Sequence, residues 1–83
     1  MNKMSEQKLG MIVINKNGEK VRALKVNIFE KLNELRAKLK SKDIIVTMDD
    51  KFYFDDAPID VQDENSISIK DILEAERYVD IRT

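Results

Sequence analysis

The sequence predicts an α+β domain in which a mixed sheet of four to five strands packs on one helix. Three observations predict this class: an Asn17-Gly18 turn between two apolar runs, a stripe of apolar residues at helical spacing, and an alternating C-terminal strand. With 83 residues, the chain has room for one small domain. We expect residues 1–8 to form a flexible leader and residues 9–83 to form that domain.

The first two strands are expected to form a β-hairpin, from Leu9 to Asn15 and from Val21 to Val26. Asn17-Gly18 is a strong hairpin signal, because both central positions of a type I′ turn need a positive φ. A two-residue loop pairs Lys16 with Glu19. The same count then predicts the pairs Ile14 with Val21, Ile12 with Ala23, Met11 with Leu24, and Leu9 with Val26.

The helix is predicted to begin at Asn27, whose side chain can cap the first turn, with Glu30 completing a capping box. Apolar residues then recur at helical spacing, at Ile28, Leu32, Leu35 and Leu39. The basic residues near its end suit the negative end of the helix dipole: Lys38, Lys40 and Lys42. No aromatic residues are interleaved with them, so we expect no nucleic-acid partner.

Two segments compete for the place of the third strand, Ile44–Met48 and Lys51–Phe54, and the sequence leaves both open. Asp55–Asp60 is typical of a turn, and Ser66–Leu73 of a short helical turn. Tyr78–Thr83 alternates apolar and charged residues, which predicts a last strand. We expect the first and last strands to pair in parallel at the centre of the sheet.

The composition argues against several chemistries. The chain has no Cys and no His, which removes disulfides, zinc sites of Cys/His type, and Cys or Ser-His nucleophiles. The paired carboxylates at 49–50 and 55–56 have no companion groups, and the acidic segment lacks the spacing and glycine of a calcium loop. We therefore predict a chain that is not an enzyme and uses no metal or cofactor. The longest apolar run is far shorter than the roughly 20 residues of a membrane helix, so we expect a cytoplasmic chain without a membrane partner.

The charges are distributed unevenly along the chain. Residues 1–42 carry eleven basic and four acidic side chains, whereas residues 43–64 carry one basic and eight acidic side chains. These opposite charges could meet across the fold, or they could attract a charged partner, including a second copy of the chain.

Two segments, Lys51–Asp60 and Glu64–Leu73, resemble the ubiquitin-like β-grasp family. Lys51–Asp60 is similar to the family's third strand, turn and fourth strand. Glu64–Leu73 is similar to the turn and the isoleucine that follow them, and the resemblance covers about residues 9–83. It implies a ubiquitin-like β-grasp fold and a non-catalytic protein-interaction domain, an adaptor at the N-terminus of a longer protein. The chain ends without the Gly-Gly of conjugated members, and Arg82 replaces an apolar residue of their recognition patch near Tyr53. Conjugation and binding to ordinary ubiquitin receptors are therefore not expected.

The hairpin is apolar on both faces, although one helix can cover only one of them. We predict that Leu9, Met11, Val13, Leu24 and Val26 face the helix and that the other face binds a partner protein. The residues predicted to bind that partner are Ile12, Ile14, Val21, Lys20, Arg22 and Tyr53. The alternative is an error in this register, in which Ile12 or Ile14 is buried at a bulge or under the N-terminal leader.

Self-association is the alternative function. The acidic segment from Asp49 to Glu64 loosely resembles the acidic loop of PB1 domains, which pair head to tail through a basic hairpin. The basic partner residues here would be Lys16, Lys20, Arg22 and Lys25. In that case the chain would be a self-associating scaffold domain.

Overall fold

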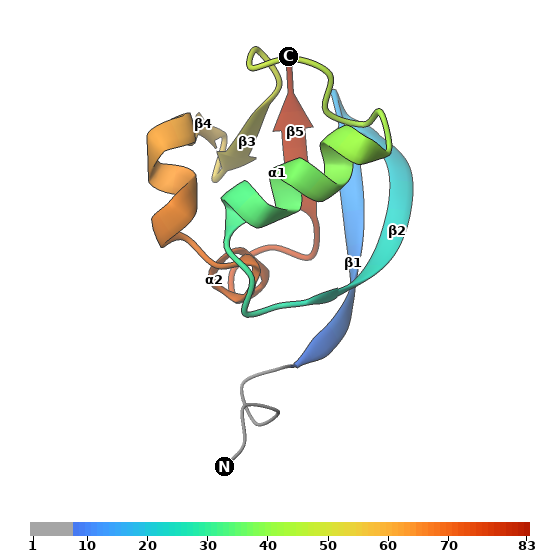
Figure 1. Ribbon diagram of the computed structural model, residues 1–83, viewed down its shortest axis with the longest axis vertical. Helices are drawn as coiled ribbons and strands as arrows, with labels where there is room; N and C mark the ends of the chain where they lie inside the picture. Colours follow the sequence, from blue (N-terminus) through green and yellow to red (C-terminus); the bar gives the residue numbers. More distant parts are fainter. Residues whose placement is uncertain (1–7) are drawn as a thin grey trace.

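A computed structural model describes residues 8–83, in which helix α1 packs across one face of a five-stranded mixed sheet (Figure 1). The strand order is β2-β1-β5-β3-β4, and β1 and β5 run parallel at its centre. The α+β class and the central parallel pair are thus confirmed, and the order is compatible with a β-grasp fold. The elements are β1 (Leu9–Lys16), β2 (Glu19–Asn27), α1 (Leu32–Ser41), β3 (Lys51–Phe54), β4 (Ala57–Pro58), the 3₁₀ helix η2 (Val61–Ser66), α2 (Ile69–Leu73) and β5 (Val79–Arg82).

The hairpin turns at Asn17-Gly18 as predicted, with φ values of 51° and 87°. Asn15 pairs with Lys20, but the next pair is Ile14 with Arg22, so one residue of β2 has no partner on β1. That residue is Val21, which forms a β-bulge. The pairs predicted from Ile14 to Leu9 were therefore wrong by one residue.

Helix α1 begins later than predicted. Asn27 ends β2, and its side-chain Oδ1 accepts hydrogen bonds from the N–H groups of Phe29 and Lys8. The capping box lies at the following turn, where the Glu34 carboxylate accepts the Lys31 N–H at 2.9 Å. Long-range pairing explains the shift, because backbone hydrogen bonds join residues 28–32 to residues 67–70 and hold residues 28–30 in a turn that precedes the helix.

The third strand is Lys51–Phe54, and Ile44–Met48 forms part of the connection from α1. This connection still contributes to the core, because Ile44 and Ile45 are buried beneath the end of the helix. The Ile44 and Ile45 N–H groups both donate to the Leu39 carbonyl, which holds the chain against α1.

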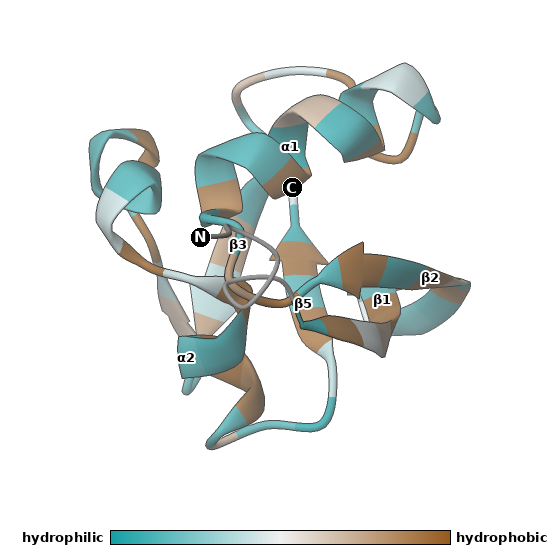
Figure 2. Ribbon diagram, turned by 60° about the horizontal axis from the view of Figure 1, so that its bottom comes forward, coloured by the Kyte–Doolittle hydropathy of each residue, from teal (hydrophilic) through white to brown (hydrophobic). Residues whose placement is uncertain are grey.

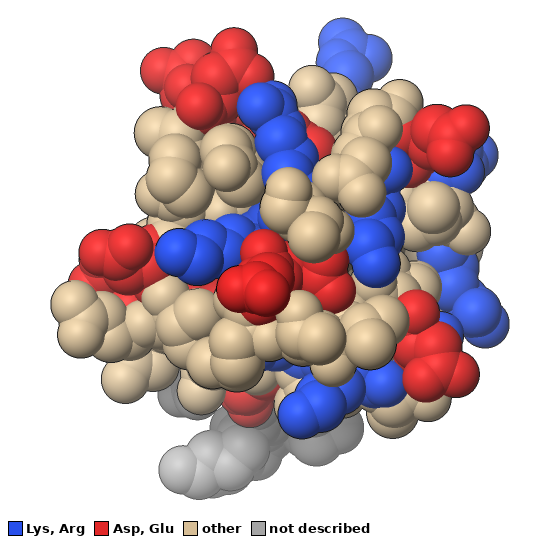
Figure 3. Space-filling view, turned by 90° about the horizontal axis from the view of Figure 1, so that it is seen from above, with Lys and Arg blue, Asp and Glu red and all other residues tan. Residues whose placement is uncertain are grey.

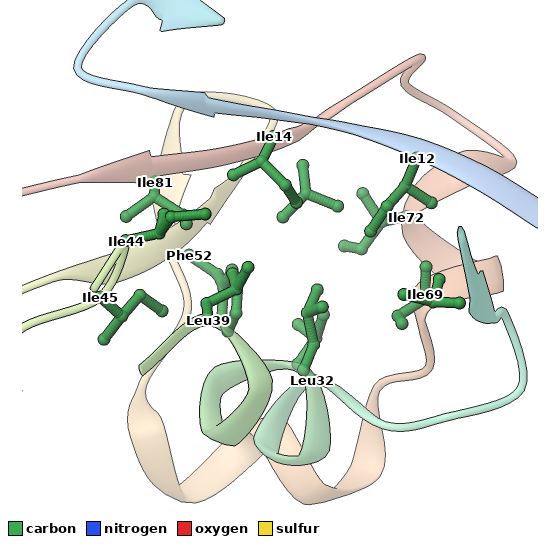
Figure 4. Close-up of a cluster of buried hydrophobic side chains, with 13 residues drawn as sticks. Ile12, Ile14, Leu32, Leu39, Ile44, Ile45, Phe52, Ile69, Ile72 and Ile81 are labelled. Carbon is green, nitrogen blue, oxygen red and sulfur yellow. The ribbon is translucent and has the colours of Figure 1, made fainter. Parts of the chain in front are cut away.

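The core lies between α1 and the sheet (Figure 4), and apolar bands mark β1, β2 and β5 (Figure 2). Its fully buried members come from both layers: Ile12, Ile14, Leu32, Leu35, Leu39, Ile45, Phe52, Ile69, Val79 and Ile81. In the described part of the chain, none of the helices has the length and apolarity needed to cross a membrane.

Candidate functional site

The prediction that the partner-binding residues Ile12 and Ile14 lie exposed on the face away from the helix was wrong. Their side chains are 1% and 0% exposed and point toward α1 (Figure 4). The register explains the error. With the bulge at Val21, Ile12 and Ile14 pair with Leu24 and Arg22, and this row of side chains faces the helix. The other row of the same strands is left on the outer face.

The outer face of the hairpin carries a contiguous row of apolar side chains. They alternate with the buried row along β1 and continue across the ladder onto β2. We call this row, together with Val21, which is exposed at the bulge of β2, the outer hairpin strip; it consists of Leu9, Met11, Val13, Val21 and Ala23. Leu9, Met11 and Val21 are 62%, 65% and 46% exposed. Val21 is therefore the one apolar residue of the predicted site that remains exposed.

Basic side chains flank the outer hairpin strip. Lys25 pairs with Met11, and Lys20 pairs with Asn15, so both lie on the outer face. The one acidic residue between positions 8 and 27 is Glu19, which pairs with Lys16. Arg22, by contrast, pairs with buried Ile14 and belongs to the side of the sheet that faces α1. The structure thus places Arg22 and Lys20 on opposite faces of the sheet.

Tyr53 belongs to a different, polar cluster on β3 and β5. The Arg82 guanidinium lies 4.5 Å from the centroid of the Tyr53 ring, a cation–π contact. Arg82 also donates to Asp56 at 2.7 Å and to Asp80 at 2.8 Å. These hydrogen bonds raise the pKa of Arg82. Tyr53 is half-buried beneath this arginine, so it is not part of the outer hairpin strip.

A buried ion pair joins α1 to η2, and sequence patterns did not predict it. Arg36 donates to both carboxylate oxygens of Glu64, at 2.8 to 3.0 Å, and to the Asp50 carbonyl at 2.7 Å. Glu64 is fully buried and Arg36 is 8% exposed. One signal was available: Arg36 lies four residues after Leu32 and therefore on the apolar face of the helix. Because Glu64 is committed to this pair, it is not available to an acidic binding surface.

Asp50 also makes its contacts with groups inside the protein. Burial alone would raise its pKa, but hydrogen bonds from the Thr83 hydroxyl and from the Val46 and Thr47 amides outweigh burial. With the charge of Lys16, at 3.7 Å, they lower the pKa of Asp50. Lys16 also donates to the Ile44 carbonyl at 2.8 Å. The side chains of Asp50 and Lys16 therefore hold the loop that follows α1 in place.

A hollow of 250 Å³ beside α2 has few groups that could take part in chemistry. Its apolar lining is Phe54, Ile59, Ile67 and Ile72, and the one charged group is Asp71. The Asp71 carboxylate accepts the Ser68 N–H at 3.0 Å and so caps α2. This hydrogen bond, together with one involving the Ser68 side chain, lowers the pKa of Asp71. Within residues 8–83, no group of three or more acidic side chains is placed to hold a metal ion.

Comparison with models of protein families finds no match for this chain, and comparison with curated protein sequences finds none either. The functional interpretation therefore depends on the surfaces described above.

Proposed function

We propose that this chain is a non-catalytic protein-interaction domain of ubiquitin-like type, a cytoplasmic adaptor that binds another protein through the outer hairpin strip. The strand order, with one helix across the sheet, supports the family assignment. The exposure of Leu9 and Met11 on the outer face of β1, with Val21 exposed at the bulge of the adjacent strand, carries the functional proposal. On a small domain, a contiguous exposed apolar surface marks a contact site.

The flanking charges define the chemistry of the partner. Lys20 and Lys25 rim the strip, and the nearest acidic group of the sheet face, Asp80, is already paired with Arg82. A partner with an apolar centre and an acidic rim matches this pattern. Such charges contribute mainly to the rate and specificity of association, whereas the apolar centre provides most of the affinity.

Site-directed photo-crosslinking in the cell tests this proposal. A photoreactive phenylalanine analogue replaces Met11 in one version and Asn33, which is exposed on α1, in a second. We expect position 11 to form an adduct with one protein and position 33 not to form it. Val21→Lys should abolish the adduct, whereas Gln62→Lys, with the same charge change on η2, should not. Identical adducts from both positions, or none from position 11, would contradict the proposal.

The charge distribution favours one second candidate, the head-to-tail scaffold. Strands β2 and β4 are the two edges of the sheet, so the basic hairpin and the acidic β3–β4 turn lie at opposite ends. Figure 3 shows Lys and Arg along the side of β2 and clusters of Asp and Glu opposite, although each side carries some of both. Within the acidic segment Asp49–Glu64, the carboxylates that are exposed and form no ion pair are Asp49, Asp55, Asp60 and Asp63. A contact of this kind would be heterologous and would build open chains.

Light scattering at low and high salt distinguishes the two functions. Charge-driven assembly should dissolve at high salt, since the Debye length falls to about 3 Å at 1 M. Association through the outer hairpin strip should persist, because it buries apolar surface. If the chain is a monomer at both salt concentrations, the scaffold function is excluded and the adaptor function remains.

A further inference from the structure

Sulfur occurs in this chain only in methionine, because the sequence has no Cys. Two methionines lie in the described residues 8–83, Met11 and Met48, and their side chains are 65% and 58% exposed. Met48 lies in the connection between α1 and β3, whereas Met11 lies in the outer hairpin strip between Leu9 and Val13. A thioether that solvent reaches is open to oxidation to methionine sulfoxide.

The sheet leaves the side chain of Met11 accessible from the β5 side of β1. On the other side lies β2, where Lys25 is the cross-strand neighbour of Met11. Strand β5 pairs with β1 only from Ile14 onward, so within the described residues no strand flanks Met11 on that side. Figure 1 shows that the first part of β1 projects beyond the beginning of β5. A small oxidant therefore reaches the Met11 sulfur without any opening of the fold.

We propose that Met11 is an oxidation site at which a peroxide switches off binding through the outer hairpin strip. This inference rests on the proposed function, because it concerns the regulation of that same surface. A lone pair of the Met11 Sδ attacks one oxygen of hydrogen peroxide, the O–O bond breaks and an S–O bond forms. The sulfur loses two electrons, and the other oxygen leaves as hydroxide, takes the remaining proton and becomes water. A sulfoxide reductase, which oxidises two thiols and releases the oxygen as water, restores the thioether.

Oxidation changes the outer hairpin strip in two ways. The sulfoxide makes the middle of an apolar row polar, so a partner has to strip water from it on binding. The sulfoxide oxygen is also a hydrogen-bond acceptor opposite Lys25, which is exposed and forms no ion pair within the described residues. Residues that face each other on neighbouring strands have Cβ atoms about 5 Å apart, so the Lys25 ammonium can donate to this oxygen. That hydrogen bond would occupy one of the two cations that rim the strip.

The fold should not change with this oxidation. The core lies on the opposite face of β1, where Ile12 and Ile14 are buried, and neither Met11 nor Met48 belongs to it. Met48 is an internal control, because its exposure is similar and it lies outside the outer hairpin strip. The oxidised domain should therefore melt within a few degrees of the reduced domain and differ from it in binding.

Crosslinking with oxidised protein tests the switch. A photoreactive analogue replaces Ala23, the exposed strip residue on β2, and the purified chain is oxidised with hydrogen peroxide, freed of it and added to a lysate of the cells used for crosslinking. Peptide mass spectrometry reports oxidation at each methionine, and a thermal melt reports the fold. We expect the adduct found in the cell to decrease about tenfold. Treatment with sulfoxide reductases and a thiol should restore it.

Substitutions separate oxidation of Met11 from other effects of peroxide. Met11→Leu is apolar and cannot be oxidised, so its adduct should resist peroxide, whereas Met11→Gln is polar and should lose the adduct without peroxide. Met48→Leu should remain as sensitive as the parent. Loss of the adduct by peroxide-treated Met11→Leu, or full adduct formation by a folded chain with oxidised Met11, would overturn this inference alone. If no adduct forms before oxidation, with the analogue at position 11 or at position 23, the proposed function fails and the inference fails with it.

Discussion

Replacement of Glu64 by Ala should remove the counter-charge of a guanidinium that has little access to water. Glu64 is 0% exposed and accepts three hydrogen bonds from Arg36. Removing one member of a buried ion pair costs about 3–5 kcal/mol, because the remaining charge stays buried without compensation. A domain of 83 residues is expected to have about 4–12 kcal/mol of stability in total. The substitution should therefore remove a large part of the free energy of unfolding.

Urea denaturation measures this loss as a lower midpoint with an unchanged slope. Glu74→Gln is the matched control, because Glu74 pairs with Lys70 at the surface and such pairs contribute about 1 kcal/mol or less. Combining Glu64→Leu with Arg36→Met should recover much of the loss, since apolar residues often replace a buried pair at little cost. A loss for Glu64→Ala no larger than that for Glu74→Gln would show that water reaches the Arg36 pair.

Two further predictions concern pH and the faces of β1. The fold lowers the pKa of Asp50 below its ordinary value of 3.8. The ionised carboxylate therefore stabilises the fold at pH values above 3.8, and this stabilisation is lost as the pH falls through the pKa of the folded state. Thermal melts of wild type and Asp50→Asn should therefore differ at neutral pH, and the difference should narrow as the pH falls below 3.8; a constant difference would contradict this role. Ile14→Lys places a charge in the core and should abolish cooperative unfolding, whereas Met11→Lys, on the exposed face of the same strand, should melt within a few degrees of wild type. Equal melting of the two variants by circular dichroism would show that these faces are misassigned.

Local signals predicted much of the fold. Asn17-Gly18 needs positive φ wherever it occurs in a hairpin, and the stripe from Leu32 to Leu39 has helical spacing whatever it packs against. The beginning of α1 was missed because the cap signal at Asn27 competes with pairing between segments about forty residues apart, which no local pattern records. The Arg36–Glu64 pair was missed for the same reason: its members are 28 residues apart.

The candidate site was missed through a single residue. A bulge has no sequence signature that distinguishes Val21 from an ordinary strand residue, yet one unpaired residue changes every later pair of the hairpin. In a hairpin that is apolar on both faces, composition cannot indicate which face the helix covers. Val21 and Lys20 nevertheless lie at the surface, as the prediction required, whereas Ile12 and Ile14 at its centre are buried.

Deletion of Val21 tests the role of the bulge. Without it, Arg22 follows Lys20 directly, the ladder becomes regular, and Leu24 still faces α1. We expect the variant to fold and to keep the cross-strand Hα contact between Met11 and Lys25, measured by nuclear Overhauser effects. Deletion of Lys25 is the control: it turns Val26 away from the core if the bulge is kept, or Leu24 if the bulge is lost, and should unfold the domain. If deletion of Val21 unfolds the domain as deletion of Lys25 does, then Val21 is an ordinary ladder residue, and the assignment of the outer hairpin strip fails with it.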